Sequence, residues 1–118
     1  MTMGTQLWDA LDYLREHGWH QGHYTDINDA ANPTPSACIL GALKIAQMEA
    51  VGNVFGIGYG YDIQALISTI EEQHPDVATD AKEQDYTLIP FFNDGKGRTF
   101  AEVERVIEKA AIKRDEAF

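Results

Sequence analysis

The most chemically specific residue in the chain is its only cysteine, Cys38. It lies in the first turn of a helix that the sequence predicts over residues 35–48, where the helix dipole would lower the pKa of a thiol. Gln21, a histidine and Asn93 or Asp94 would then supply an amide donor, a base and an orienting group. Free cysteines in such apolar helices are usually inert core residues, so we assign no catalytic residue.

Three histidines, His17, His20 and His23, are spaced three residues apart. Imidazoles at that spacing on a helix could bind zinc. However, Gly18 and Gly22 interrupt a helix in this region, and no second cluster supplies a fourth ligand. We therefore expect exposed loop histidines and no metal site.

Glycines at positions 52, 56, 58 and 60 invite comparison with a nucleotide-binding loop. Their spacing does not fit G-x-G-x-x-G, and no Gly-Lys-Ser/Thr sequence follows them as in a phosphate-binding loop. We expect an ordered loop over residues 51–61 whose aromatic side chains pack against the core. The sequence therefore predicts no cofactor.

A turn near residue 95 carries side chains that could bind an anion or the backbone of a partner. Asp94 and Arg98 flank a Gly-Lys-Gly sequence there. The alternative is that Asp94 organises its own turn while Arg98 pairs with a nearby carboxylate. We favour this alternative, because aspartate and glycine in a turn need no further cause.

The chain carries 19 acidic and 9 basic residues, and its formal net charge is −10. Binding to nucleic acids or to anionic membranes needs a basic face, so both are disfavoured. Six acidic residues gather in one stretch, namely Glu71, Glu72, Asp76, Asp80, Glu83 and Asp85. They predict a solvated face or, alternatively, an acidic docking surface for a basic protein or a mimic of nucleic acid.

The 118 residues and the 44% hydrophobic content suit one domain, which we place over residues 1–118. No stretch approaches the roughly 20 apolar residues that a membrane span needs. The first residues lack the basic start and the apolar run of a signal peptide. A single cysteine cannot form an internal disulfide, so we expect a cytoplasmic protein.

Periodic apolar residues predict a mainly α-helical fold, a compact bundle of about four helices with long ordered loops. The predicted helices cover residues 6–17, 35–48 and 62–73, and a fourth begins at a capping box over 99–102. Residues 76–85 suit a connector or a short helix. Residues 86–92 contain a proline and suit an extended segment or a short edge strand.

Three segments carry a family resemblance. They are Gly18-Trp19-His20-Gln21-Gly22, Cys38-Ile39-Leu40-Gly41-Ala42, and Asn93-Asp94-Gly95-Lys96-Gly97-Arg98-Thr99 with Glu102-Val103. Together they resemble a small domain-of-unknown-function family of actinobacteria and their phages. Its members carry G-W-x-Q-G, C-x-L-G-A and N-D-x-x-G-R-T-x-x-E-V segments, and the resemblance spans nearly the whole chain.

The resemblance implies an actinobacterial or phage source and a helical fold, but no known activity. The motif segments could converge in one cleft and form the site of a small enzyme or ligand-binding domain. That site would consist of Trp19, Gln21, Cys38, Asn93, Asp94 and Arg98. The other hypothesis, which we favour, is a non-catalytic interaction module that binds a basic host or phage protein. The sequence does not predict an oligomeric state.

Overall fold

The computed structural model describes residues 5–22, 34–51, 57–80 and 88–117, and these residues form six helices and no strand. The helices are α1 (Leu7–His17), α2 (Ile39–Val51), α3 (Ile57–Gln73), α4 (Pro75–Asp80), α5 (Leu88–Asn93) and α6 (Phe100–Ala117). The predicted mainly helical fold is confirmed. The predicted number of helices is too low, because α4 and α5 are short additional helices, and most of the predicted long loops lie outside the described residues.

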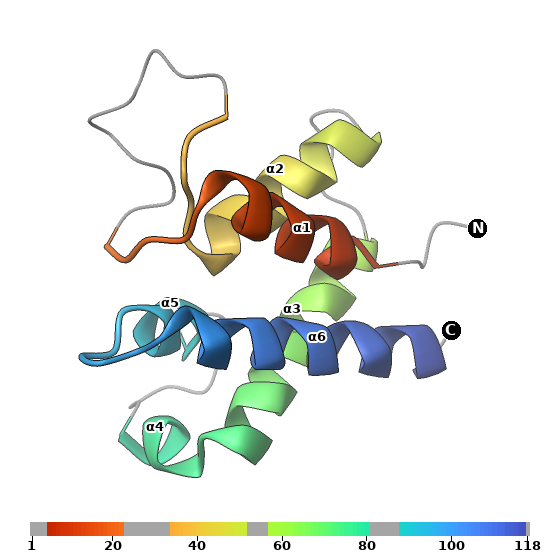
Figure 1. Cartoon of the computed structure of the whole chain (residues 1–118). Coiled ribbons are helices and arrows are strands. Elements are labelled where there is room, and N and C mark those ends of the chain that lie inside the picture. The colour runs from red at the N-terminus through yellow and green to blue at the C-terminus, as the bar shows by residue number, and fades with distance from the viewer. Residues whose placement is uncertain (1–4, 23–33, 52–56, 81–87, 118) are drawn as a thin grey trace.

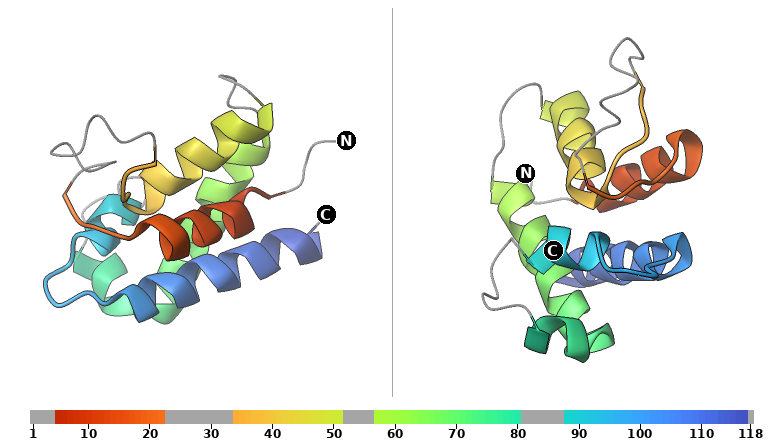
Figure 2. Two further views of the ribbon diagram at one scale, coloured as in Figure 1. Left: turned by 45° about the horizontal axis from the view of Figure 1, so that its top comes forward. Right: turned by 90° about the vertical axis from the view of Figure 1, so that its left-hand side faces the viewer.

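The longer helices share one apolar core. α1 packs against α2 on one side and α6 on the other, and α3 crosses behind α6 (Figure 1). The views of Figure 2 show α1, α2 and α6 side by side, with α4 beyond the far end of α3. The apolar faces predicted for these helices are buried, as their 3.6-residue period requires. Their buried side chains include Leu7, Leu11 and Leu14 of α1, Leu66 and Ile70 of α3, and Val103, Val106 and Ile107 of α6.

The start of α2 differs from the prediction. The sequence predicts a helix from Pro35, but α2 begins at Ile39. The preceding residues lie beside the segment that follows α1, because Ala37 N donates to Gly18 O (3.1 Å) and His20 N donates to Ala37 O (3.0 Å). In this short parallel bridge the backbone O of Ala37 accepts from His20, whereas in a helix that began at Pro35 it would accept from the N–H four residues later.

The start of α3 also differs from the prediction. The sequence predicts a loop over 51–61 and Asp62 as a helix cap, but α3 already includes the end of that stretch, and residues 52–56 lie outside the described part. Asp62 is fully buried inside α3. Its Oδ1 accepts a hydrogen bond from Arg114 Nε (2.7 Å), and its Oδ2 accepts one from Gln6 N (3.0 Å). The cap prediction was wrong because a buried arginine of α6 binds this carboxylate.

The stretch 86–92, which the sequence predicts as an extended segment or an edge strand, is helical from Leu88 onward. Its first two residues lie outside the described part of the chain. Pro90 occupies the first turn of α5, where its missing N–H removes no helical hydrogen bond. Ile89 and Phe92 are buried, so an apolar run that suits a strand instead supplies the inner face of a short helix.

Two local predictions hold. The short helix considered for residues 76–85 is α4, which ends at Asp80, and residues 81–85 lie outside the described part. The capping box at the start of α6 is formed, because Thr99 N donates to Glu102 Oε1 (2.9 Å) and Glu102 N donates to Thr99 Oγ1 (3.2 Å). None of the described helices combines the length and hydropathy that crossing a bilayer requires.

Candidate functional site

Asn93, the last residue of α5, connects segments that are far apart in the sequence. Its Oδ1 accepts hydrogen bonds from Trp19 Nε1 (2.8 Å) and from the backbone N of Ile39, the first residue of α2 (3.1 Å). Its Nδ2 donates to the backbone O of His20 (3.2 Å) and to Oδ1 of Asp94 (2.9 Å). Asn93 is buried, and we call this set of four hydrogen bonds the Asn93 clasp.

Gln21 and Asp94 extend the clasp toward the surface. Gln21 Nε2 donates to the backbone O of Asn93 (3.0 Å) and of Gly95 (2.8 Å). The backbone N of Gly22 donates to Asp94 Oδ1 (2.9 Å). Gly22 has a φ of 94°, a value that favours glycine at this turn. The G-W-x-Q-G and N-D segments therefore bind each other directly.

Arg98 is fixed next to the same turn by three contacts. Its Nε donates to the backbone O of Phe92 (2.9 Å), and its Nη1 lies 3.2 Å from Glu102 Oε2. Its guanidinium carbon lies 4.1 Å from the centroid of the Phe92 ring, which adds a cation–π contact. The hydrogen bond from Thr99 N, and then the charge of Arg98, lower the pKa of Glu102. The predicted pairing of Arg98 with a nearby carboxylate is confirmed.

Cys38 directly precedes α2 and is buried, with 8% of its surface exposed. Burial raises the pKa of its thiol, although Gly41 N donates a hydrogen bond to Sγ (3.3 Å) and favours the thiolate. The expected lowering of this pKa by the helix dipole is therefore wrong, because desolvation of the thiolate outweighs the donors at the helix start. A thiol with a raised pKa has little reactive thiolate at neutral pH.

The structure brings the predicted site residues into one region. They are Trp19, Gln21, Cys38, Asn93, Asp94 and Arg98. Many of their polar atoms bond to one another or to the backbone between them. In this arrangement they hold the segment 18–22, the start of α2 and the end of α5 in fixed relative positions.

In the described part of the chain, no group of three or more His, Cys, Asp or Glu side chains is placed to hold a metal ion. His17 Nε2 lies 3.8 Å from Glu16 Oε2, and His20 Nδ1 lies 2.8 Å from Ser36 Oγ. His23 lies outside the described residues. The two described histidines of the triplet thus contact different partners.

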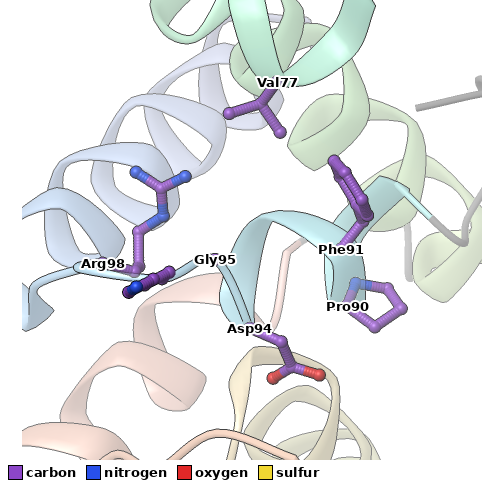
Figure 3. Close-up of a pocket in the computed structure, with 7 residues that line it drawn as sticks. Val77, Pro90, Phe91, Asp94, Gly95 and Arg98 are labelled. Atoms are coloured by element: carbon purple, nitrogen blue, oxygen red, sulfur yellow. The ribbon is translucent and has the colours of Figure 1, made fainter. Parts of the chain in front are cut away.

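A pocket of about 660 Å³ lies beside the clasp, between α4, α5 and the turn that leads to α6 (Figure 3). Its apolar wall consists of Val77, Pro90 and Phe91, and its polar rim includes Asp94, Lys96 and Arg98. We call it the Phe91 pocket. The Phe91 side chain is 49% exposed, whereas its neighbour Phe92 is fully buried. Asp94 and Arg98 of this pocket are among the residues that the sequence motifs indicate, whereas its apolar wall is not.

A second depression, of about 380 Å³, lies between α1 and residues that flank or belong to α2. Four carboxylates line it, from Asp9, Asp12, Glu16 and Glu49. We call it the acidic hollow. Tyr13 lies among them and donates a hydrogen bond to the backbone O of Pro35 (2.7 Å). Burial, and then the charge of Glu49, raise the pKa of Tyr13.

The acidic stretch predicted as a docking surface is only partly described. Glu71, Glu72, Asp76 and Asp80 belong to α3 and α4, and Glu83 and Asp85 lie outside the described residues. Glu72 Oε1 lies 2.7 Å from Lys113 Nζ, and this hydrogen bond lowers the pKa of Glu72. Asp76 is exposed. One member of the stretch is therefore already paired with α6.

His74 lies between α3 and α4, next to the aromatic residue beneath the Phe91 pocket. Its ring centroid lies 4.7 Å from that of Phe92. Burial lowers the pKa of His74 below its ordinary value of 6.5, and the positive charges of Arg98 and Arg105 lower it further, while Glu102 acts in the opposite direction. Protonation of this imidazole is therefore disfavoured in the folded state.

The free energy of unfolding is expected to decrease as the pH falls below 6.5, the ordinary pKa of His74. As the pH falls, the unfolded chain protonates His74 at a higher pH than the folded chain does. The stabilisation is therefore complete above pH 6.5, and it is lost as the pH falls from 6.5 toward the lower pKa of His74 in the folded state. Urea unfolding at several pH values between about 5 and 8 should show this slope reduced in His74→Gln. An unaltered slope in His74→Gln would show that this histidine does not contribute.

Over the described residues, these features define a small all-helical protein whose motif segments are joined by the Asn93 clasp. The chain belongs to a family of unknown function (DUF6197), whose model matches residues 1–113. The resemblance to a domain-of-unknown-function family is thereby confirmed. No curated protein and no solved structure shows a significant match to the chain.

Proposed function

We propose that the protein is a non-catalytic interaction module that binds a basic partner protein through the acidic hollow. The observation that carries this proposal is the gathering of four carboxylates around one depression, on a chain with a net charge of −10. The sequence resemblance implies an actinobacterial or phage source. The partner would then be a basic host or phage protein in the host cytoplasm.

Two side chains of α1 that can carry positive charge, Arg15 and His17, lie near the carboxylates of the hollow. Arg15 Nε lies 2.8 Å from Glu104 of α6, and the closest approach of Arg15 to Asp12 is 3.9 Å. His17, at the end of α1, lines the hollow as well. Such a surface attracts a cationic partner over roughly the 8–10 Å range that salt permits. Complementary charges of this kind raise the association rate and select the partner.

The test uses a fluorescently labelled peptide whose lysines alternate with glycines. Fluorescence anisotropy is measured at increasing salt for the parent protein and for the triple variant Asp9→Asn, Asp12→Asn, Glu16→Gln. We expect the variant to bind about tenfold more weakly at low salt, since three exposed ion pairs together contribute on the order of 1.4 kcal/mol. The salt dependence of binding should also become shallower.

A matched triple variant, Glu71→Gln, Asp76→Asn, Glu116→Gln, removes the same formal charge outside the hollow. It should bind the peptide nearly as well as the parent protein. Equal losses in both variants would mean that only net charge matters. A larger loss in the matched variant would place binding outside the hollow, on the acidic stretch predicted from the sequence. Either outcome would contradict the proposal.

The second candidate is a small enzyme or ligand-binding domain whose site consists of the six motif residues. What favours it is their convergence, with Trp19 and Gln21 hydrogen-bonded to Asn93 and Asp94 adjacent to it. What weighs against it is that the clasp already engages these groups, and that burial raises the pKa of the Cys38 thiol. We therefore favour the interaction module.

Alkylation of Cys38 by iodoacetamide separates the two candidates where a thiol nucleophile is concerned. The interaction module predicts that the native thiol reacts about 100-fold more slowly than the same thiol in urea, because it is buried and protonated. The catalytic candidate predicts native labelling at least as fast as that of the unfolded chain near pH 7. Mass spectrometry of the intact protein measures both rates, and Cys38→Ser provides the unreactive control.

A further inference from the structure

We infer that the Phe91 pocket binds a protein segment that presents a large apolar side chain beside a carboxylate. This site shares no residue with the acidic hollow. The inference therefore goes beyond the proposed function and does not depend on it. It rests on the exposed Phe91 of the apolar wall and on the exposed Lys96 at the rim.

Phe91 is the exposed member of the apolar wall, and Val77 and Pro90 are partly buried. Phe91 is 49% exposed, and Val77 and Pro90 line the pocket beside it, as Figure 3 shows. Apolar surface gains on the order of 25 cal/mol for each Å² removed from water, so a partner side chain that covers the ring would be stabilised there. Aromatic residues at the centre of such patches commonly anchor protein partners.

Lys96 places a positive charge at the rim. Lys96 is exposed and forms no ion pair with the residues that the structure describes. Arg98 directs its Nη2 toward Gly95, because a Cβ atom at Gly95 would lie only 3.0 Å from that nitrogen. The carboxylate of Asp94 also lies at the rim, and its Oδ1 already accepts two hydrogen bonds. Arg98 is already paired with Glu102, so Lys96 is the rim cation, among the described residues, that favours an anionic group of the ligand.

The shape of the pocket favours a protein segment as the occupant. Small-molecule sites enclose most of the surface of their ligand. Here two short helices and a turn form the walls, and half of the Phe91 ring stays open to solvent. A protein segment can place one anchor side chain in such a pocket and continue along the surrounding surface. The carboxylate that follows the anchor would lie near Lys96.

The experiment compares two tetrapeptides, Gly-Ser-Gly-Trp with a free carboxyl terminus and the same peptide with a carboxamide. ¹H–¹⁵N NMR titration of the full chain follows the backbone signals of Gly95, Lys96 and Gly97. We expect both peptides to shift these signals, and the acid to bind about fivefold more tightly than the amide. Lys96→Gln should remove the difference in affinity between acid and amide, and Phe91→Ala should weaken the binding of both peptides.

Matched controls are Lys109→Gln, an exposed lysine of α6, and Ile112→Ala, an exposed apolar residue of the same helix. Both should bind the two peptides like the parent protein. The inference is overturned if neither peptide shifts the signals of residues 95–97 at millimolar concentration. It is also overturned if acid and amide bind equally, or if the control variants lose as much affinity as Lys96→Gln and Phe91→Ala.

Discussion

Replacing Asn93 by alanine is expected to lower the free energy of unfolding by about 3 kcal/mol, a large part of the 5–15 kcal/mol typical of a domain. The substitution removes the four hydrogen bonds of the Asn93 clasp. It leaves the indole N–H of Trp19, the backbone N–H of Ile39 and the backbone O of His20 without this partner. Each polar group left unpaired in a buried position costs about 1–3 kcal/mol.

Urea unfolding followed by circular dichroism measures this loss. Trp19→Phe is the milder companion variant, because it removes one of the hydrogen bonds and keeps most of the apolar packing. Trp19→Phe should lower the free energy of unfolding by about 1 kcal/mol, and this variant should remain folded even if Asn93→Ala does not. A loss below about 1 kcal/mol in Asn93→Ala would mean that the clasp is not important for stability.

Replacing Asp62 by alanine is expected to cost about 3–5 kcal/mol, because it leaves the buried charge of Arg114 without its carboxylate. Asp62 is 0% exposed and Arg114 is 4% exposed, so solvent screens this pair little. The Nε of Arg114 lies 2.7 Å from Asp62 Oδ1. The same substitution also removes the acceptor for the backbone N–H of Gln6, which precedes α1.

The same two helices carry a matched pair at the surface. Glu72 of α3 lies 2.7 Å from Lys113 of α6, and the Glu72 side chain is 57% exposed. Glu72→Ala should therefore cost far less than Asp62→Ala, because solvent screens an exposed ion pair. Combining Asp62→Leu with Arg114→Met should recover much of the loss seen in Asp62→Ala, since no charge is then buried alone. Equal costs for Asp62→Ala and Glu72→Ala in urea unfolding would contradict the buried pair.

The elements that could be predicted from the sequence depend on local signals. The apolar stripe of α1 repeats at helical spacing, so its buried face follows from the sequence. The capping box of Thr99 and Glu102 lies within one turn of α6, and its hydrogen bonds formed as predicted. In both cases the residues that determine the structure lie within a few positions of one another.

The predictions that failed depend on contacts between distant residues. The backbone N of Ile39 donates to Asn93 Oδ1, 54 positions away. This hydrogen bond caps the start of α2 at Ile39, whereas the local sequence predicts a start at Pro35. Asp62 resembles a cap in its local sequence but pairs with Arg114, 52 positions away. Hydrophobic periodicity and capping preferences carry no information about such partners.

The candidate site was only partly predictable, because it too depends on contacts between distant residues. Its motif residues lie in one region, but a site built from them stays a prediction, and the sequence could not show that their polar atoms would bond to one another. Asp9, Asp12 and Glu16 have the i, i+3, i+7 spacing of one helical face, a signal available from the sequence. Glu49 of α2 lines the same hollow, and this position could be seen only in the tertiary structure.

The central claim is that Asn93 binds the motif segments together, and the two tryptophan side chains of the chain test it most directly. Trp19 Nε1 donates to the buried Asn93, whereas Trp8 Nε1 donates to Asp115 in an exposed hydrogen bond of the same length, 2.8 Å. Hydrogen exchange of the two indole N–H groups, measured by NMR, should be about 100-fold slower for Trp19. In Asn93→Ala that protection should be lost, while exchange at Trp8 stays fast. Equal exchange of both indoles in the parent protein, or protection of Trp19 that survives the Asn93 substitution, would contradict the claim.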